Sequence, residues 1–428
     1  MNIIFLKLGK ITDIEEHGIY QDLMRKFRDT GHNVYIVNPQ ERRLVHGSVF
    51  KAYGAELVEN GGVHILNVNT LNVQKTSIVE KGIGTLLIEN QFKSAIKKYL
   101  GNIKFDLITY STPPITFTNV VKYLKRKNPQ AISYLQLKDI FPQNAVDIGM
   151  LQGMPVQGSW FMVQGWVVRA KYQLYKYFRR KEKKLYAVSD YIGCMSPANV
   201  EFLLKHNPEV KTDRVEVAPN SIDLNHDDNL DLNDNEGRDI RIKYGLPLDK
   251  PVFIYGGNLG KPQGIDYLVK CLDANKKRTD CYFVVVGSGT EYGKLEAWYN
   301  ANLNDNLNVK VMKELPKADY DLLVRSCDVG MIFLDHRFTI PNYPSRLLSY
   351  LENKMPVLCA TDVNTDIGKI AEENGYGYWC ESVKPEDFTA LVDKMLASDM
   401  IAMGERGYEF LKKNYLVEHT YNAIMRHL

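Results

Sequence analysis

Short apolar runs alternate with helical patterns through nearly the whole sequence, and this alternation restricts the possible fold more than any other feature. In the first half, strand-like runs are expected at residues 3–8, 34–37, 63–68, 105–110, 131–137, 185–196 and 215–220, and helices at 18–30, 86–100 and 115–127. Consecutive strands joined by helices form parallel sheets through right-handed crossovers. The first half therefore predicts a doubly wound α/β sheet with helices on both faces.

The same alternation starts again after residue 250. Strands are expected at 251–255, 281–286, 308–312, 328–334, 356–360 and 376–379, and helices at about 264–274, 290–301, 317–326, 345–353 and 385–397. A chain of 428 residues is too long for one ordinary core, so two domains of about 200 residues are expected. We place a first domain at 1–222, an acidic linker at 223–250 and a second domain at 251–403. A last helical segment at 404–428 could fold back on either domain.

The composition is typical of a soluble globular protein. Apolar residues make up 45% of the chain and charged residues 25%, and no run of 18 apolar residues predicts a transmembrane helix. The six cysteines lack metal-ligand spacing and several lie in apolar runs, which indicates free thiols in a reducing cytosol. Residues 1–218 hold 30 Lys and Arg against 19 Asp and Glu, whereas the remainder holds 24 against 32. The first half is therefore expected to meet something anionic, and no aromatic-basic motif favours nucleic acid.

Residues 160–184 form a long helical candidate with an apolar side and a basic side. The apolar side comprises Trp160, Val163, Val167, Leu174 and Phe178, and the basic side comprises Arg169, Lys176, Arg180, Lys183 and Lys184. Such a helix can lie on an anionic membrane surface. It is also consistent with a core helix whose charges are solvated, and the sequence leaves both interpretations open.

Residues 342–357 combine a Pro-containing entry, a helix of about two and a half turns and a buried strand. Pro344 suits the first helical position, where a missing N–H costs nothing. The free N–H groups of that turn, next to Ser345 and Arg346, form an anion site. Ser349 and Glu352 continue the polar side of the same helix. The alternative is an ordinary amphipathic helix that leads into a strand.

Glycines follow two strands of the second half. Gly256 and Gly257 permit close approach of the backbone to a ligand, and Asn258 and Lys261 after them can meet a phosphate. The pattern is not G-x-G-x-x-G, which disfavours a dinucleotide site. Gly287 ends the next strand, so both loops leave the same edge of one parallel sheet as the helix described above. Tight turns with no ligand are the alternative.

These motifs, in this order, resemble the donor domain of the GT-B glycosyltransferases of family 4. The closest likeness is to the bacterial branch that builds capsular and O-antigen polysaccharides. The resemblance rests on residues 256–264, residues 287–289 and the Pro-Ser-Arg…Lys-Met-Pro-Val segment. In the first half, Gly18 with Gly31 and His32, and residues 139–142, are similar to acceptor-domain landmarks of that branch. The likeness covers nearly the whole chain.

The resemblance implies a GT-B fold, in which two Rossmann-like domains face each other across a cleft and the C-terminal helix crosses back to the first. It implies transfer of a hexosyl or N-acetylhexosaminyl group from a nucleoside diphosphate sugar, with UDP-sugars favoured. The anomeric configuration would be retained, and no metal or other cofactor would be required. The acceptor would be lipid-linked or a saccharide. The enzyme would be cytoplasmic, with peripheral contact to the inner face of a bacterial membrane through residues 160–184.

The same resemblance assigns the donor side. Positive side chains and helix N-termini would stabilise the leaving diphosphate, in agreement with the lack of an Asp-x-Asp motif at a strand end. Arg346 and Ser345 would contact the diphosphate, with Asn258 and Lys261 close by. The loops at Gly257 and Gly287 would lie against the donor. The backbone near Lys313 would meet the base.

On the acceptor side, Asp139 would orient or deprotonate the acceptor hydroxyl. His17, beside Gly18, could touch the sugar, and a surface histidine without such a role is the alternative.

The sequence departs from the family pattern at two positions. The family usually carries two glutamates eight positions apart, the second of which holds the ribose, and Pro341 and Ser349 occupy those positions here. Ser349 offers only neutral hydrogen bonds, and Glu352 is the alternative ribose ligand. Asn342 or the 335–340 loop is left for the donor sugar. A non-catalytic nucleotide-sugar-binding subunit or sensor with the same fold is therefore the alternative to an enzyme.

Overall fold

The computed structural model describes residues 1–428 except 45–52, 74–77, 154–165, 226–233 and 304–306. The chain divides into two compact units. The first unit comprises Met1–Asp223 and Val417–Leu428, and the second comprises Leu224–Leu416. Each unit has its own sheet, so each is described by itself.

The sheet of the first unit is parallel except at one edge. Its strands lie in the order β3-β4-β2-β1-β5-β6-β7-β8, and only β3 runs antiparallel to its neighbour. The strands are β1 (Asn2–Leu6), β2 (Asn33–Glu41), β3 (Ala55–Asn60), β4 (Val63–Thr70), β5 (Leu107–Ser111), β6 (Ile132–Leu137), β7 (Tyr191–Cys194) and β8 (Val215–Val217). Apolar residues dominate β1 and β5 because helices cover both faces there.

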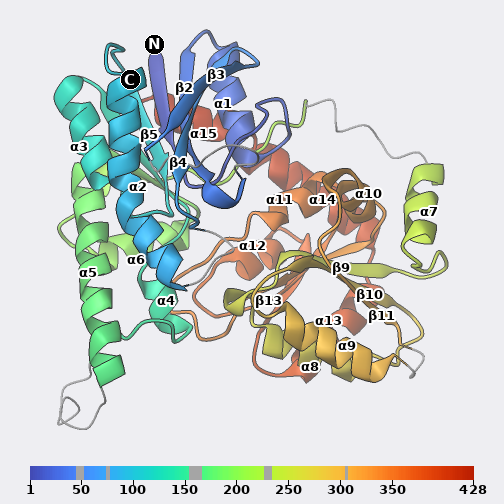
Figure 1. Cartoon of the computed structure of the whole chain (residues 1–428). Helices are drawn as coiled ribbons and strands as arrows, with labels where there is room; N and C mark the ends of the chain where they lie inside the picture. Colours follow the sequence, from blue (N-terminus) through green and yellow to red (C-terminus); the bar gives the residue numbers. More distant parts are fainter. Residues whose placement is uncertain (45–52, 74–77, 154–165, 226–233, 304–306) are drawn as a thin grey trace. The chain divides into compact units, whose positions relative to one another are not determined.

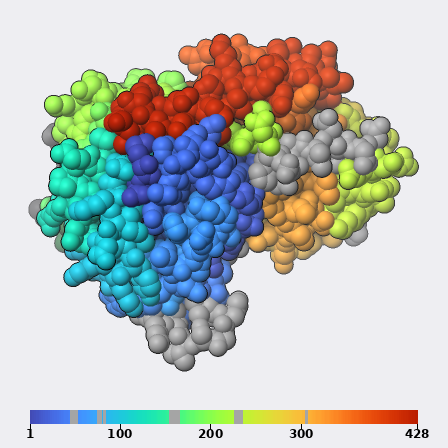
Figure 2. All heavy atoms as spheres, turned by 90° about the horizontal axis from the view of Figure 1, so that it is seen from above, coloured from blue at the N-terminus to red at the C-terminus, as the bar shows by residue number. Residues whose placement is uncertain are grey.

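Helices of the first unit come from both ends of the chain. They are α1 (Ile19–Asp29), α2 (Ile78–Tyr99), α3 (Thr118–Lys127), α4 (Gln143–Asp147), α5 (Trp166–Val188), α6 (Pro197–His206) and α15 (Val417–Met425). Helices α1 and α15 pack on one face of the sheet, where Phe5 joins Phe27 and Ile424 in one core, and α2 and α3 cover the other (Figure 1). The view from above shows the atoms of the chain end directly against those of the first strands (Figure 2).

The second unit contains a fully parallel sheet in the order β11-β10-β9-β12-β13-β14. Its strands are β9 (Val252–Asn258), β10 (Tyr282–Ser288), β11 (Val309–Met312), β12 (Val329–Phe333), β13 (Val357–Thr361) and β14 (Gly377–Glu381). Its helices are α7 (Asp234–Lys243), α8 (Ile265–Asn275), α9 (Tyr292–Asn302), α10 (Lys317–Arg325), α11 (Arg346–Glu352), α12 (Ile367–Glu373), α13 (Pro385–Leu396) and α14 (Met400–Asn414). The expected fold class, two Rossmann-like doubly wound sheets, is confirmed.

Several elements differ from the sequence expectation for identifiable reasons. The edge strand β3 was not expected, because its Ala-Glu-Leu-Val-Glu-Asn sequence is half polar and its residues stay largely accessible. The strand expected from residue 185 starts only at Tyr191, because α5 continues to Val188. The last helical segment is two helices, α14 and α15, which belong to different units.

Part of the expected acidic linker is helical. Within residues 223–250, α7 packs next to α10, and the Arg241 guanidinium bonds the Ser326 carbonyl and the Asp328 carboxylate, the latter at 2.7 Å. Lys243 forms an ion pair of 2.7 Å with Asp319 of α10. Tertiary contacts therefore stabilise helix α7 in a segment whose acidic composition predicted a solvated linker.

In the part of the chain that the structure describes, no helix is both long and apolar enough to cross a membrane.

The packing of α15 generates a stability prediction. Ile424 is fully buried in the core of the first unit, so Ile424→Ala leaves a cavity and should lower the free energy of unfolding by about 2–5 kcal/mol. Ile401→Ala is the matched control, because Ile401 is 81% exposed and should change the value by less than about 0.5 kcal/mol. Urea unfolding measures both variants. Equal effects of the two substitutions would contradict the placement of α15 in this core.

Candidate functional site

The carboxyl ends of β9 and β10 bring two glycines into close backbone contact. Gly257 pairs with Gly287, and a Cβ added to Gly287 would lie 1.9 Å from the Gly257 carbonyl oxygen. Gly257 also has a φ of 120°, which side-chain-bearing residues rarely adopt. Both positions therefore require glycine, and they leave an open stretch of backbone at this edge.

Arg346, the first residue of α11, lies beside this open backbone. The carbon of its guanidinium is 4.3 Å from the centre of the Tyr255 ring, and its Nη2 would be 3.7 Å from a Cβ at Gly257. Its Nη1 is buried and has no hydrogen-bond partner among the described residues. A buried guanidinium nitrogen without a partner is unfavourable, so the arrangement favours an anion at this position.

Two tyrosines hold α11 and the β9 loop in place. The Tyr350 hydroxyl accepts a hydrogen bond from the Gly256 N–H at 3.4 Å and lies 3.2 Å from the Ile254 carbonyl oxygen. The Tyr255 hydroxyl donates to the Asn258 carbonyl at 2.8 Å. Sequence reasoning missed both tyrosines. The one signal for Tyr350 was its place one turn after Arg346 on the same helix.

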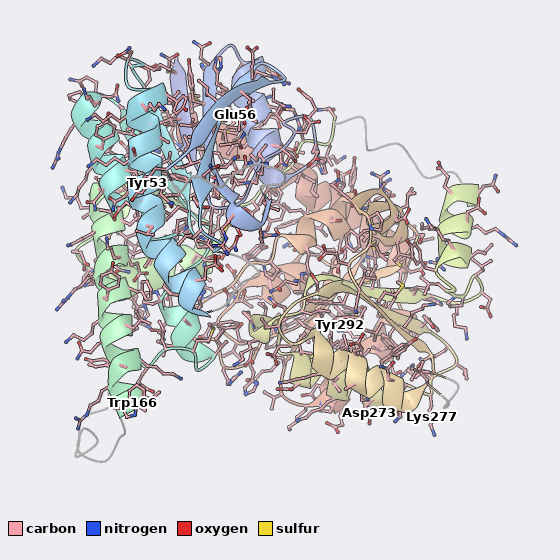
Figure 3. The ribbon with its side chains drawn as sticks, viewed as in Figure 1. Tyr53, Glu56, Trp166, Asp273, Lys277 and Tyr292 are labelled. Carbon is pink, nitrogen blue, oxygen red and sulfur yellow. The ribbon has the colours of Figure 1, made fainter. Side chains whose placement is uncertain are left out.

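The other residues predicted to bind the sugar donor do not all lie beside Arg346. The Asn258 amide donates to Gln263 Oε1 at 2.9 Å, and Lys261 is exposed in the turn between them. Lys313 follows β11, but its ammonium lies 3.9 Å from the Glu296 carboxylate and 5.8 Å from the Tyr292 ring. Both residues belong to α9, on which Tyr292 is labelled in Figure 3. The structure therefore brings Gly257, Gly287, Asn258 and Arg346 together and directs the Lys313 side chain to α9.

The polar side of α11 is shorter than expected. The helix has seven residues, so Ser345 precedes it and is exposed, while Ser349 and Glu352 are half-buried on it. The Asn342 amide nitrogen is buried without a hydrogen-bond partner among the described residues, and the Asn342 carbonyl accepts from the Thr365 hydroxyl. Asn342 thus has a donor free for a ligand at the place where the family pattern expects a sugar contact.

Asp139 lies at the carboxyl end of β6 in the first unit. The Thr112 hydroxyl oxygen accepts from the N–H groups of Lys138 at 3.0 Å and Asp139 at 3.1 Å, which fixes the turn. Burial raises the pKa of Asp139 to about 6. A carboxyl group with this pKa can accept a proton near neutral pH, which is the property required of a general base.

His17 and Gly18 anchor the loop before α1. The His17 Nδ1 lies 3.2 Å from an Asp22 oxygen, and the Gly18 N–H donates to the other oxygen at 3.0 Å. Burial acts to raise the pKa of Asp22, but the hydrogen bonds from His17, Asp223 and Gly18 lower it below its usual range. His17 is therefore engaged in the fold, and its contact with a sugar stays a prediction.

Helix α5 is only partly the expected amphipathic helix. Trp166 lies at its outer end and is 80% exposed (Figure 3), and Leu174 is 45% exposed. Phe178, expected on the same apolar side, instead packs against Phe141 with ring centres 5.0 Å apart. Trp160 and Val163 lie outside the described residues. Contact of this helix with a membrane stays a prediction.

Within the described residues, no three His, Cys, Asp or Glu side chains are grouped as metal ligands.

The raised pKa of Asp139 generates a pH-dependent prediction. Its folded-state pKa of about 6 lies above the ordinary value of 3.8, so the folded state binds more protons than the unfolded state between these pH values. Ionising Asp139 thus costs stability as the pH rises through this window, and the full cost is present above pH 6. Asp139→Asn should raise the free energy of unfolding at pH 7.5 by about 1–3 kcal/mol, and the gain should shrink toward pH 4.

Chemical denaturation at both pH values measures this effect. Asp213→Asn, at an exposed aspartate of the same unit, is the control and should change the value by less than about 0.5 kcal/mol. A loss of stability in Asp139→Asn at pH 7.5 would contradict the assigned burial.

Known proteins resemble this chain in part of its sequence and in its fold. Residues 237–410, which hold the Arg346 region, match the family model described as Glycosyl transferases group 1. The chain is 24% identical over 166 residues to the probable glycosyltransferase WbjE of Pseudomonas aeruginosa, which covers 39% of this chain and 41% of that protein. It is also 24% identical over 156 residues to the putative colanic acid biosynthesis glycosyl transferase WcaI of Escherichia coli, which covers 36% of each. The chain thus matches about two fifths of the length of these curated relatives.

Solved structures match over nearly the full length. The sucrose-phosphate synthase of Thermosynechococcus elongatus has a TM-score of 0.70 at 14% identity and covers 99% of this chain and 98% of that one. Anabaena HepE in complex with UDP has a TM-score of 0.65 at 13% identity and covers 100% and 99%. At such low identity these similarities establish the fold alone. Residues 237–410 thus match the glycosyl transferases group 1 family model, and the fold of the chain is GT-B.

Proposed function

We propose that this chain is a retaining glycosyltransferase of polysaccharide biosynthesis that uses a nucleoside diphosphate sugar, with UDP-sugars favoured. The observation that carries the proposal is the buried Nη1 of Arg346, which lacks a partner among the described residues and lies beside the open backbone of Gly257. The names of WbjE and WcaI support the reaction class. A related fold crystallised with UDP and with UDP-glucose supports the donor class.

The chemistry at the donor side is stabilisation of a leaving diphosphate. A guanidinium presents parallel N–H donors that match phosphate oxygens, and its low exposure strengthens each contact. The N–H groups of the β9 and β10 loops add neutral donors. Asn258, Lys261 and Ser345, exposed near this edge, supply further contacts, and no metal is required in this scheme.

The ribose is held without the usual carboxylate in this proposal. Ser349 lies on α11 one turn beyond Ser345, which precedes the helix, and Glu352 lies about one further turn along. A serine offers a neutral hydrogen bond, whereas a carboxylate would accept two charge-assisted ones from the ribose hydroxyls. Asn342 contacts the donor sugar through its buried amide nitrogen.

The acceptor is a lipid-linked or saccharide hydroxyl that Asp139 orients or deprotonates. The pKa of about 6 supports this role, because the carboxylate form dominates at pH 7 while its basicity exceeds that of an ordinary aspartate. Peripheral contact of α5 with the inner face of a membrane would bring a lipid-linked acceptor to the first unit, and its exposed Trp166 supports that location.

The test of the proposal is the loss of transfer on removal of one guanidinium. Arg346→Ala should lower kcat/KM for the donor about 10²- to 10³-fold, the usual cost of losing one donor to developing charge. Arg238→Ala is the control, because Arg238 is exposed in the same unit. A panel of UDP-, GDP- and dTDP-sugars with membrane extract as the acceptor source provides the assay. A loss below threefold in Arg346→Ala would contradict the assignment.

A second experiment addresses the ribose contact. Ser349→Ala should weaken UDP binding about 3- to 10-fold, as expected for one neutral hydrogen bond. The same substitution should leave binding of 2′,3′-dideoxy-UDP unchanged, because that nucleotide lacks the hydroxyls that Ser349 contacts. Calorimetric titration measures all four affinities. An equal loss for both nucleotides would remove Ser349 from the ribose site and leave Glu352 as the candidate.

The alternative function is nucleotide-sugar binding without catalysis. The replacement of both family glutamates, by Pro341 and Ser349, favours it. UDP binding by the purified protein, combined with no transfer and no donor hydrolysis across the whole panel, would support this alternative against the enzyme.

A further inference from the structure

Lys7 is a buried lysine whose ammonium has no counter-charge in the described part of the chain. It directly follows β1, is 6% exposed, and its backbone N–H donates to the Val37 carbonyl at 3.2 Å. The ammonium nitrogen lies 4.4 Å from the centre of the Tyr20 ring and would be 3.6 Å from a Cβ at Gly9. Among the described residues, no carboxylate or carbonyl oxygen bonds to it. The fold therefore keeps a positive charge here that its own groups do not balance.

The contacts of the Lys7 ammonium with its neighbours do not offset the cost of burying its positive charge. A tyrosine ring attracts an ammonium, but less strongly than a carboxylate or a full set of hydrogen bonds would. Burial without a partner lowers the pKa of Lys7 to about 8, so the lysine is less stable in its charged form than on the surface. An apolar side chain would fill the same space without this cost. The charge is accounted for if a ligand supplies the missing oxygen atoms.

The polar groups around Lys7 lie at neighbouring strand ends of one sheet. Leu6 pairs with Tyr110, so Lys7 and Ser111 are the next residues on adjacent parallel strands. Burial raises the pKa of the Tyr20 hydroxyl to about 12, with Ser111 acting to lower this pKa and the charge of Asp139 acting to raise it further. Lys7 directly after β1, Ser111 at the end of β5 and Asp139 beyond β6 thus lie at one edge of the sheet, and the Tyr20 ring contacts Lys7 there. In open parallel sheets, ligands bind at this carboxyl edge.

We propose that Lys7, with Tyr20 and Ser111, binds an oxyanion of the acceptor, a phosphate or a carboxylate, beside Asp139. The lysine supplies a point charge and the two hydroxyls supply neutral donors, a combination suited to tetrahedral or planar oxyanions. The acceptor class follows: its accepting hydroxyl lies near a phosphate or an acidic sugar. The proposal rests on the glycosyl transfer proposed above and names the acceptor of that reaction.

Pyrophosphate titrated into the full chain by calorimetry tests the proposal. All variants carry Arg346→Ala, so that the donor side does not contribute an anion site. Adding Lys7→Met should weaken pyrophosphate binding at least about tenfold, because a charge-assisted contact is lost. Lys122→Met, at an exposed lysine of α3 in the same unit, should leave it unchanged. Glucuronate titrated in parallel distinguishes a carboxylate-bearing acceptor from a phosphate-bearing one.

Further variants keep the test decisive. Ser111→Ala removes one hydroxyl and keeps the charge, so it should weaken binding less than Lys7→Met, and melting curves show whether each variant folds. Equal pyrophosphate affinities with and without Lys7 would overturn the proposal. So would a failure of the chain that carries only Arg346→Ala to bind either pyrophosphate or glucuronate. A matching loss of UDP affinity in Lys7→Met alone would instead assign Lys7 to the donor. Failure of the unsubstituted chain to bind UDP would count against the proposed function only, because the pyrophosphate arm does not depend on it.

Discussion

The stacking of the Arg346 guanidinium on Tyr255, next to backbone that only glycine can form, is the contact on which the second unit's site depends. Gly257 has a positive φ and Gly287 has no room for a Cβ, so the loop edge stays open where the guanidinium lies. The Tyr350 hydroxyl ties α11 to the backbone of β9 on the other side. The cation is thus fixed before any ligand arrives, which is the preorganisation that stabilisation of developing charge requires.

The first unit uses burial differently. At its strand ends, burial raises the pKa of Asp139 and lowers that of Lys7, so the charged form of each group is less stable than on the surface. Neither shift is offset by an opposite charge in the described residues, and both cost stability. Groups kept under such conditions cluster at functional sites, and this agrees with an acceptor role for the unit.

Much of this was accessible from the sequence, and the remainder depended on tertiary contacts. Strand–helix alternation predicted both parallel sheets, and the glycine spacing predicted the loops that lie beside Arg346. The alternation could not predict β3, because half of its residues are polar and the strand forms by pairing with β4. It also missed α7, which ion pairs and hydrogen bonds to α10 and nearby residues stabilise. Lys7 was read only as part of an apolar strand, because burial and the lack of a partner are properties of the folded chain.

Hydrogen exchange of the whole protein with and without UDP tests whether Arg346 and the glycine loops beside it bind the nucleotide diphosphate. We expect UDP to protect residues 256–264, 287–289 and 342–352, and we expect Arg346→Ala to lose that protection. UDP binding that leaves these three segments unchanged, or that protects them equally without Arg346, would contradict this expectation.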